Sequence, residues 1–549
     1  MSTAIRADVA VVGAGPAGMA AALAAADLGC QVVLVDSGPA TGGQVYRAPM
    51  AAGAADGPRV SSRKMPRRLR RAAAHEGIHH LPETTVWQAT APDRAAEAGG
   101  HAVTGDLART GDLARTGDLA RTGDLARTGD LARTGDLAGI GSPEFVLWLA
   151  DAAGRAPAAS AGPDLLRVRA VVIATGATEI TVPFPGWDLP GVTTAGAAQA
   201  LLKAHGVVAG HRVLVAGSGP LLLPAATALA AAGVRVLAVL EANPAGPAAA
   251  RAAALAPFTE KVAEAAGYAK VLARHRVPVL TDRAVTACHG AGRVQRATIS
   301  RLTRDWRPVP GPGREVAVDA VHTSFGFCPA LDLPRLLGCA DIPQPGRPAA
   351  AVWHDGDLAT SVPGVFAAGE TTGVAGADVA ELEGYIAGAA AARFLGRIGA
   401  VTFGKRTARV RAGLTRARRF ARVVDDLYPF QTGWLDWPAP DTVTCRCEEV
   451  PWSAIGEAVA GGVRDVRAVK GVTRCGMGYC QGRVCGPVLQ QAVATAAGRS
   501  LTEVGDLQSR PVVTPVTLAA IAASGVSSGS GGPTRSGGPG VSSGQSVGR

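Results

Sequence analysis

Short, mainly apolar runs alternate along the chain with longer stretches rich in Ala and Leu. Five of these runs have the length and character of strands that are buried on both faces of a parallel sheet. They are Val9–Val12, Gln31–Val35, Ala170–Ala174, Arg212–Ala216 and Arg235–Leu240. Gly-rich loops at 13–18 and 217–222 each follow a strand-like run and open an Ala/Leu stretch, which predicts a helix. The pattern predicts an α/β fold with two domains of the nucleotide-binding type.

Composition sets the scale of these domains. The chain has 549 residues, of which 47% are hydrophobic but only 4% aromatic. The cores must therefore be built mostly from Ala, Val and Leu in closely packed helices and sheets. At roughly 100–200 residues per domain, the length predicts about three domains.

The formal net charge of +11 comes mainly from Arg residues that are spread over many segments. The densest runs are Arg63–Arg71 and Lys405–Arg422, and neither has the interleaved aromatic residues that stack on bases. We therefore expect no nucleic-acid partner. A solvated face is the simpler interpretation of both runs, and a docking face for an acidic partner subunit is the alternative.

The sequence predicts neither a signal peptide nor a transmembrane segment. The chain passes from Met1 through a few polar residues into its first strand, and the nearest apolar candidate, Leu221–Leu240, is broken by Pro224 and Gly233. We therefore expect a cytoplasmic protein with reduced thiols. Nine cysteines, five of them between residues 445 and 485, then favour metal ligation over disulfides.

A hexapeptide repeat, Thr-Gly-Asp-Leu-Ala-Arg, occupies residues 104–139. Its flanks, Thr85–Ala89 and Glu144–Leu149, look like the two strands of a hairpin whose turn has been expanded. A disordered insertion is the simpler interpretation, because closure entropy grows slowly with loop length, and a left-handed β-helix is the alternative. The Gly/Ser-rich tail, residues 524–549, is also expected to be disordered.

The first Gly-rich loop has the arrangement G-x-G-x-x-G at Gly13, Gly15 and Gly18. These glycines permit a tight turn, the approach of a pyrophosphate to the backbone, and close packing of helix on strand. The helix N-terminus then attracts the phosphates. Asp36 ends the second strand, where its carboxylate can bind ribose hydroxyls. The loop therefore predicts a dinucleotide site, with a structural glycine turn as the alternative.

Three further stretches resemble the two-dinucleotide-domain flavoproteins: Thr41–Gln44, Ala174–Gly176 and Gly364–Glu370. The resemblance implies that Thr41–Gln44 lies beside the flavin, that Ala174–Gly176 returns the chain to the first domain, and that Gly364–Glu370 supplies the acid that binds the ribityl chain. The last position is usually Asp in that superfamily, so the longer Glu370 implies a shifted contact. FAD is therefore the cofactor expected in the first site. The candidate cofactor-binding residues are Gly13, Gly15, Pro16, Ala17, Gly18, Asp36, Ser37, Gly43, Gln44, Val86, Thr175, Gly176, Gly369 and Glu370.

The second Gly-rich loop is incomplete. Gly217 and Gly219 are present, but Leu222 stands where the third glycine belongs, and its side chain should push the helix away from the strand. Glu241 ends the next strand and could bind a ribose. The site could bind NAD(H) poorly, bind another adenine nucleotide, or be a structural relic. The remaining cysteines form no C-x-x-C pair, so a disulfide reductase is not expected; they are Cys30, Cys288, Cys328 and Cys339.

The cysteines near the C-terminus carry the most specific chemistry. Four thiolates suit either a [2Fe-2S] cluster or structural zinc. An iron–sulfur cluster is favoured, because a flavin needs an outlet for single electrons and because glycines let backbone N–H groups reach the sulfurs. Four cations near the cysteines in the sequence would offset the negative charge of a cluster. They are Arg446, Lys470, Arg474 and Arg483.

The stretches 445–450 and 473–483 resemble the [2Fe-2S] domain of the bacterioferritin-associated-ferredoxin type. The resemblance implies four ligands: Cys445, Cys447, Cys480 and Cys485. Cys475 occupies a position where that family needs no cysteine, so it is a spare thiol or a substitute ligand.

The combination resembles the larger flavin subunit of heteromeric amine and amino-acid dehydrogenases, such as opine oxidase. The resemblance implies an electron-transfer subunit that passes electrons from FAD to the cluster and an external acceptor, while a second flavoprotein subunit oxidises a C–N bond. The alternative is a self-sufficient NADH-dependent reductase that feeds a partner through the cluster. The domains expected are an FAD-binding domain (1–185 and 314–400), an NAD(P)-binding-like domain (186–313), a helical linker (401–440), a [2Fe-2S] domain (441–498) and a C-terminal extension (499–523).

Overall fold

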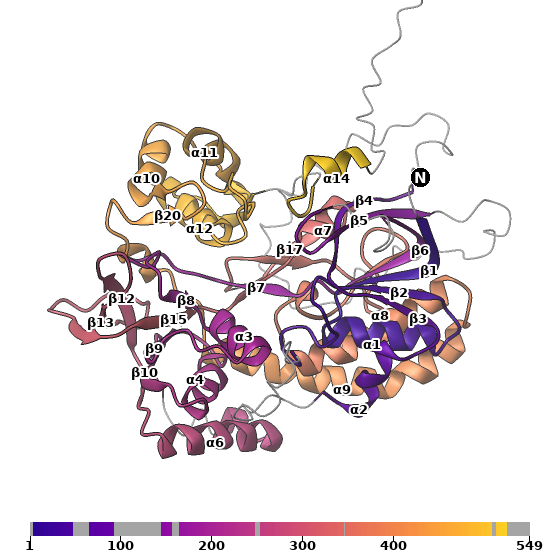
Figure 1. Cartoon of the computed structure of the whole chain (residues 1–549), viewed down its shortest axis with the longest axis horizontal. Coiled ribbons are helices and arrows are strands. Elements are labelled where there is room, and N and C mark those ends of the chain that lie inside the picture. The colour runs from indigo at the N-terminus through magenta and orange to yellow at the C-terminus, as the bar shows by residue number, and fades with distance from the viewer. Residues whose placement is uncertain are drawn as a thin grey trace, which may run out of the picture.

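Two α/β domains and a small helical domain make up the protein, as the computed structural model shows (Figure 1). The structure describes residues 4–47, 65–92, 144–155, 164–246, 253–344, 346–507 and 512–523. The expectations for the repeat at 104–139 and the tail at 524–549 concern residues outside these ranges. None of the described helices is both long enough and apolar enough to cross a membrane.

The first domain is built on a sheet with the strand order β3-β2-β1-β6-β5-β4, with β19 beside β6. Its parallel strands are β1 (Ala4–Val12), β2 (Val32–Val35), β3 (Ile78–Leu81), β6 (Leu165–Ile173) and β19 (Val365–Ala367). The strands β4 (Thr84–Thr90) and β5 (Phe145–Asp151) pair in antiparallel fashion, with Val86 opposite Leu149. The hairpin predicted from the flanks of the repeat is therefore confirmed.

Small residues let the helices of this domain pack closely. Helix α1 (Pro16–Ala26) is buried along its length and lies against α8 (Ala377–Phe394). A Cβ added at Gly384 or Gly388 of α8 would lie 2.0 or 2.1 Å from a carbonyl oxygen of α1. The Ala- and Gly-rich composition thus serves backbone-to-backbone contact rather than aromatic packing.

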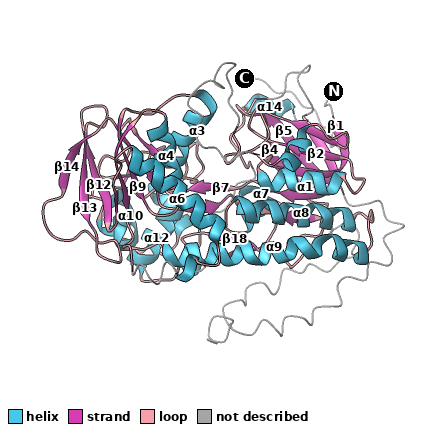
Figure 2. Ribbon diagram, turned by 90° about the horizontal axis from the view of Figure 1, so that it is seen from below, coloured by secondary structure: helices cyan, strands magenta, loops and turns pink. Residues whose placement is uncertain are grey.

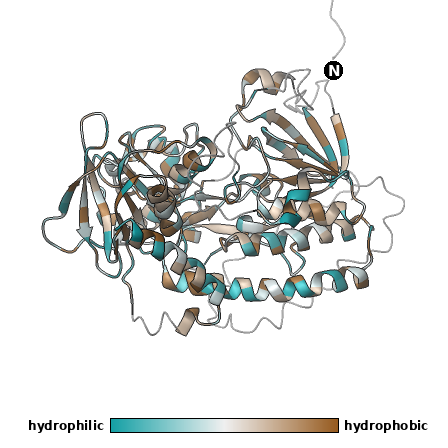
Figure 3. Ribbon diagram, turned by 60° about the horizontal axis from the view of Figure 1, so that its bottom comes forward, coloured by the Kyte–Doolittle hydropathy of each residue, from teal (hydrophilic) through white to brown (hydrophobic). Residues whose placement is uncertain are grey.

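Helix α9 (Ala400–Leu427) runs along α8 and carries the second Arg-rich run (Figures 2 and 3). Its Phe403 and Leu414 join the core of the first domain, so the expected linker helix is part of that domain. Arg411 pairs with Asp357, whereas several other cations of the helix are exposed, as both a solvated face and a docking face would require. The short helices α2 (Arg67–Arg70) and η2 (Arg71–Ala73) carry the end of the first Arg-rich run.

The second domain has a parallel sheet with the order β11-β10-β9-β15-β8 and an antiparallel sheet with the order β12-β13-β14. The strands are β8 (Val192–Thr194), β9 (Arg212–Gly217), β10 (Arg235–Glu241), β11 (Val279–Leu280), β12 (Arg283–His289), β13 (Arg296–Arg301), β14 (Arg314–Ala317) and β15 (Ala320–Ser324). The helices are α3 (Ala195–His205), α4 (Leu222–Ala231) and α6 (Thr259–Arg274).

The boundary between the two α/β domains differs from the expected one at residue 313. Both β14 and β15 pair with strands of the second domain, so the chain returns to the first domain only after Ser324. The connection consists of β7 (Ala177–Glu179) paired with β16 (Phe327–Pro329). The elements that follow it are α7 (Asp332–Leu336), β17 (Asp341–Pro343), β18 (Ala350–Val352) and η5 (Gly369–Thr372).

The C-terminal domain is small, helical and rich in cysteine. It contains η6 (Gly433–Asp436), β20 (Val443–Cys445), β21 (Val450–Pro451), α10 (Trp452–Ala460), α11 (Val466–Thr473), α12 (Gly486–Ala497) and α13 (Leu501–Val504). Side chains define its helix starts: Asp465 accepts a hydrogen bond from Ala468 N at 2.8 Å, and Ser500 and Glu503 form a capping box. A last helix, α14 (Leu518–Ala523), follows a stretch that returns to the first domain.

Candidate functional site

The first Gly-rich loop has the shape that a dinucleotide requires. A Cβ added at Gly13, where φ is +104°, would lie 2.2 Å from Ala174 O, and one added at Gly18 would lie 1.6 Å from Gly13 O. Gly15 differs, because nothing lies within 4 Å of its added Cβ and it borders a cavity. Two glycines therefore hold strand and helix together, and the third leaves open space where a phosphate can reach the backbone.

Asp36 holds the same loop from the end of β2. Its carboxylate accepts hydrogen bonds from Ala14 N at 2.5 Å and from Gly38 N at 2.6 Å, one on each oxygen. Since each carboxylate oxygen has two lone pairs, each can still accept a bond from a ribose hydroxyl. The loop and the acid predicted from the sequence are thus brought together, and they fit the adenosine end of FAD.

A cavity of about 2030 Å³ begins at this loop and is lined by residues of all three domains. Most of the candidate cofactor-binding residues lie on its wall. They are Gly13, Gly15, Pro16, Ala17, Asp36, Ser37, Gly43, Gln44, Thr175, Gly176 and Glu370. Gly18 and Gly369 are buried behind the wall. Val86 is only 4% exposed in the core of β4 and does not line the cavity, so the structure gives its side chain a packing role.

Glu370 lies on the cavity wall near the position expected for the ribityl chain. Gly376 N donates a hydrogen bond to its Oε1 at 2.7 Å, and burial raises the pKa of its carboxyl. Behind it, Glu383 is 1% exposed and accepts hydrogen bonds from Gly369 N at 2.9 Å and Thr372 Oγ1 at 2.7 Å. Arg418 of α9 balances the charge of Glu383 at 2.9 Å. Glu383 thus fixes the segment that presents Glu370.

Two buried acids near the candidate cofactor site were not found from the sequence. Glu383 could have been noticed as an acid within an otherwise Ala-rich helix. Glu179 lies on β7 just after the Thr175–Gly176 segment and lines the cavity. It accepts a hydrogen bond from Gly196 N at 2.9 Å near the start of α3, and burial raises the pKa of its carboxyl.

The second Gly-rich loop borders the same cavity but is built differently. Helix α4 begins at Leu222, two residues after Pro220, whereas α1 begins at the corresponding Pro16. Leu222 is buried in the core of the second domain. The third glycine position therefore contributes to packing here, and the helix N-terminus lies farther along the chain than in the first loop.

Glu241 is held within a buried polar network at this second loop. It is 8% exposed and accepts hydrogen bonds from Gly219 N and Asn243 N, both at 3.0 Å. Asn243 also donates to Ser218 Oγ at 2.7 Å and accepts from Trp306 Nε1 at 3.2 Å. Burial raises the pKa of Glu241. Asp36 makes two equivalent backbone contacts but lines the cavity, whereas Glu241 does not line it and also accepts a hydrogen bond from Asn243 Nδ2 at 3.2 Å. The Glu241 carboxylate therefore supports the protein's own loop and is less accessible to a ribose than that of Asp36.

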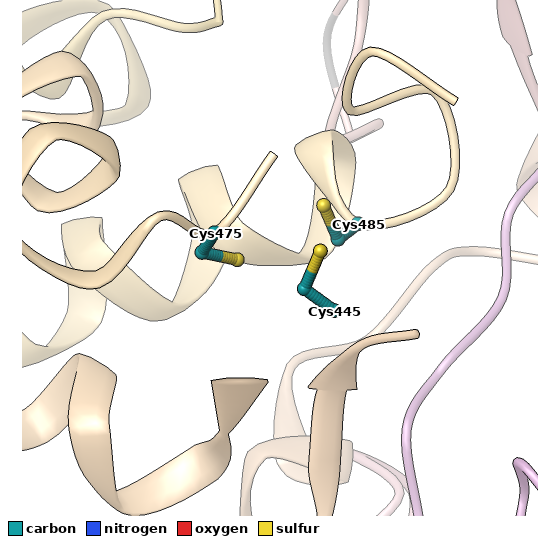
Figure 4. Close-up of side chains that lie close together, drawn as sticks. All are labelled: Cys445, Cys475 and Cys485. Atoms are coloured by element: carbon teal, nitrogen blue, oxygen red, sulfur yellow. The ribbon is translucent and has the colours of Figure 1, made fainter. Parts of the chain in front are cut away.

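The cysteines of the C-terminal domain converge. The sulfur atoms of Cys445, Cys475 and Cys485 all lie within 4.8 Å of one another, and the three residues are at most 2% exposed (Figure 4). Hydrogen bonds from the Cys475 and Cys485 thiols lower the pKa of Cys445 to about 2. Cys447 and Cys480 are hydrogen-bonded to each other beside this group. Of the four expected ligands, Cys445 and Cys485 are therefore grouped with Cys475. Cys447 and Cys480 form a neighbouring pair.

Glycines make room for this arrangement. A Cβ at Gly478 would lie 2.1 Å from Cys447 Cβ. Gly476 and Gly482 both have φ of +83°, and a Cβ on either would lie within 2.6 Å of Leu507 Cδ1, which covers the loop. Five converging thiols are the soft donors that iron–sulfur clusters and zinc prefer. The donor set therefore fits a thiolate-bound metal centre.

The cysteine loop is tied to both α/β domains. Arg483 donates to Asp332 at 3.1 Å and to Cys480 O at 3.4 Å, and it lines the cavity together with Val484. On the other side, the Arg446 guanidinium lies 5.1 Å from the ring centre of Trp187. Of the four cations expected to offset the charge of a cluster, three are bound to other groups: Arg446 to Asp188 O at 3.2 Å, Arg474 to Glu448 at 2.8 Å and Arg483 to Asp332.

Two dinucleotide-type domains around one cavity, with a loop of converging thiols that contributes Arg483 and Val484 to its wall, define a class of protein: an FAD-dependent oxidoreductase with a cysteine-rich C-terminal domain. Three family matches agree with this class. Residues 8–108 match the family described as FAD dependent oxidoreductase. Residues 159–396 match Pyridine nucleotide-disulphide oxidoreductase, and residues 445–525 match the Sarcosine oxidase A3 domain.

Whole-chain relatives narrow the class to one family. The A subunit of opine oxidase from Agrobacterium tumefaciens (strain Ach5) is 30% identical over 534 residues, which cover 94% of this chain and 91% of that protein. Hydrogen cyanide synthase subunit HcnB of Pseudomonas aeruginosa is 32% identical over 353 residues, covering 64% of this chain and 75% of that protein. The chain belongs to the family of the opine oxidase A subunits, and its relatives also include subunits of hydrogen cyanide synthase and sarcosine oxidase.

A solved structure shares the fold. The crystal structure of L-proline dehydrogenase from P. horikoshii superimposes with a TM-score of 0.61 at 17% identity, covering 94% of this chain and 80% of that chain. The match extends over all three domains of the chain and supports the α/β architecture with its C-terminal addition.

Proposed function

We propose that this chain is the electron-transfer subunit of a heteromeric dehydrogenase of the amino-acid, opine or hydroxyproline type. In this proposal electrons pass from FAD to a [2Fe-2S] cluster and then to an external acceptor. One observation carries the proposal: the cavity that begins at the FAD-type loop is also lined by Arg483 and Val484, which lie between Cys480 and Cys485. A flavin in the cavity and a metal at the thiols would then be close neighbours.

The residues of the chain have distinct tasks in this proposal. The first Gly-rich loop and Asp36 hold the adenosine diphosphate end of FAD, and Glu370 faces the ribityl chain. Cys445, Cys447, Cys480 and Cys485 hold the cluster, with Cys475 donating a hydrogen bond to the Cys445 sulfur. Arg483 fixes the cysteine loop against α7 through Asp332. When bound, FAD accepts electrons in pairs and the cluster passes them on singly.

The partner in this proposal is a second flavoprotein subunit that oxidises a C–N bond. The support is the family, because its members are named as subunits of opine oxidase, of hydrogen cyanide synthase and of sarcosine oxidase. The rival hypothesis, an NADH-dependent reductase, requires a working second nucleotide site. The commitment of Glu241 to a buried network weighs against it.

Anaerobic mixing of the co-purified complex separates these hypotheses. The expected result is that an amino-acid substrate bleaches the flavin absorbance and produces the paramagnetic signal of a reduced cluster, whereas NADH does neither. Rapid flavin bleaching by NADH with this chain alone would favour the reductase. Metal analysis of the same sample gives the second test, since zinc without iron would rule out the electron-transfer mechanism.

A further inference from the structure

Two positively charged side chains on the cavity wall have no task in the proposed electron transfer. Arg47 follows the loop expected beside the flavin in the first domain, and Lys203 lies on α3 of the second domain. The two cations therefore come from different domains and border the same space.

Neither cation has a carboxylate partner among the residues that the structure describes. Arg47 Nε is buried without a hydrogen-bond partner there, and Lys203 Nζ donates to an uncharged acceptor, Gln199 Oε1, at 3.1 Å. Three other half-buried cations on the same wall do pair with acids. These pairs are Lys261 with Asp378, Arg347 with Asp425, and Arg483 with Asp332.

The position of Lys203 near Arg47 disfavours the charged form of its ammonium group. Burial, and next the charge of Arg47, lower the pKa of Lys203 to about 8. Two like charges that share a partly buried space repel each other, and an anion between them would relieve that repulsion. A cation in a cavity whose pKa is perturbed, as that of Lys203 is, is found at ligand sites more often than in packed cores.

The charge and geometry of the pair indicate the chemistry of the anion. A guanidinium binds phosphate or carboxylate through two parallel hydrogen bonds, and an ammonium adds a point charge. A phosphate monoester carries about −1.5 to −2 at neutral pH, which matches two cations, whereas a carboxylate carries −1. The pair therefore suits a phosphate monoester best.

The cavity has room for such a ligand in addition to FAD. Pockets for a single ligand usually measure roughly 300–1,000 Å³, whereas this cavity measures about 2030 Å³. The diphosphate of FAD is accounted for by the N-terminus of α1 and the open space at Gly15. We propose that Arg47 and Lys203 together bind the phosphate group of a second ligand, a phosphate monoester, held between the two α/β domains beside the FAD site.

Titration of the full-length holoprotein with inorganic phosphate, followed by calorimetry in phosphate-free buffer, tests this site. The wild type should bind phosphate while it retains FAD. Lys203→Met and Arg47→Met should each weaken phosphate binding roughly tenfold or more, because each removes a charge-assisted hydrogen bond. Lys203→Arg should keep the binding. The matched controls Lys405→Met and Arg406→Met remove exposed cations of α9 outside the cavity and should change nothing.

Two outcomes overturn the proposal. One is phosphate binding that is undetectable in the wild type or unchanged in both cavity variants. The other is loss of FAD from both variants, which would assign the pair to the diphosphate of the dinucleotide. If a Met variant does not fold, the wild-type protein is labelled with acetic anhydride instead. Bound phosphate should then protect the Lys203 amine from acetylation. FAD and iron are measured in the same samples. A protein that lacks FAD or iron would contradict the proposed electron-transfer function, whereas a protein that holds both but binds no phosphate would contradict only the phosphate site.

Discussion

Replacing Gly478 by Ala should remove the metal while leaving the fold and the flavin in place. The added Cβ would lie 2.1 Å from Cys447 Cβ, whereas carbon atoms in contact are about 3.5–4.0 Å apart. The two atoms must therefore separate by at least ~1.4 Å. Metal–ligand distances vary by only about 0.2 Å in working sites. Cys447 cannot move that far and remain a ligand.

Iron per chain, sulfide per chain and the visible spectrum measure the effect. We expect Gly478→Ala to lose most of its iron and to keep the flavin content of the wild type. Gly471→Ala is the matched control, since this glycine lies in the preceding helix α11 and nothing is within 4 Å of its added Cβ. Cys447→Ser supplies the comparison for direct loss of the ligand.

Wild-type iron content in Gly478→Ala would refute this reasoning, because the Cys447 loop would then tolerate a displacement far larger than ligation allows. Loss of iron in Gly478→Ala together with normal iron in Cys447→Ser would show that the glycine acts on another sulfur. That result would transfer the role of ligand from Cys447 to Cys475, which already lies near Cys445 and Cys485.

Four further predictions concern the two cofactor sites and the stability of the fold. Cys475→Ser should retain iron, since a hydroxyl can also donate to the Cys445 sulfur, and iron loss measured by metal analysis would identify Cys475 as a ligand. Gly18→Ala should purify without flavin absorbance, because its Cβ would lie 1.6 Å from Gly13 O, whereas Gly267→Ala, with open space around its Cβ, should keep the flavin. Glu383→Ala should lower the free energy of unfolding in denaturant by about 1–3 kcal/mol, because the buried Gly369 N and the Thr372 hydroxyl lose their acceptor, whereas Arg418 is 41% exposed and can be hydrated; a change below ~0.5 kcal/mol would contradict this. Finally, the lowered pKa of Lys203 means that the unfolded chain binds more protons between about pH 8 and pH 10.5, so stability should rise with pH across that window. In phosphate-free buffer Lys203→Met should be up to ~3 kcal/mol more stable than the wild type at pH 7, and thermal melts should show this difference shrinking as the pH rises from about 8 to 10.5.

Features set by short stretches of sequence were predictable. The strands, the Gly-rich loops and the partly lost second loop follow from local patterns, and β1, β2, β6, β9 and β10 lie where those patterns place them. The hairpin around the repeat was predictable for the same reason, because alternation along two flanks is enough to pair β4 with β5.

Features that depend on distant contacts were not predictable. The domain boundary was misplaced because β14 and β15 look like any other strands until their partners are known. The grouping of Cys475 with Cys445 depends on how the loop around Gly476 folds back under Leu507, which spacing alone does not encode. The part that Glu383 plays in holding the Gly369–Glu370 segment is visible only from its contacts with Gly369 and Arg418.

The anchoring of the C-terminal domain has a consequence for how the protein can move. Trp187 of the second domain donates a hydrogen bond to Val443 O at 2.5 Å, while Asp332 of the first domain binds Arg483. The small domain thus bridges its two larger neighbours, and a rotation of one against the other would have to break one of these contacts. If the chain carries out the proposed electron transfer, we therefore expect it to act as a rigid relay, with the electron donor and acceptor binding at fixed sites and no domain swinging between them.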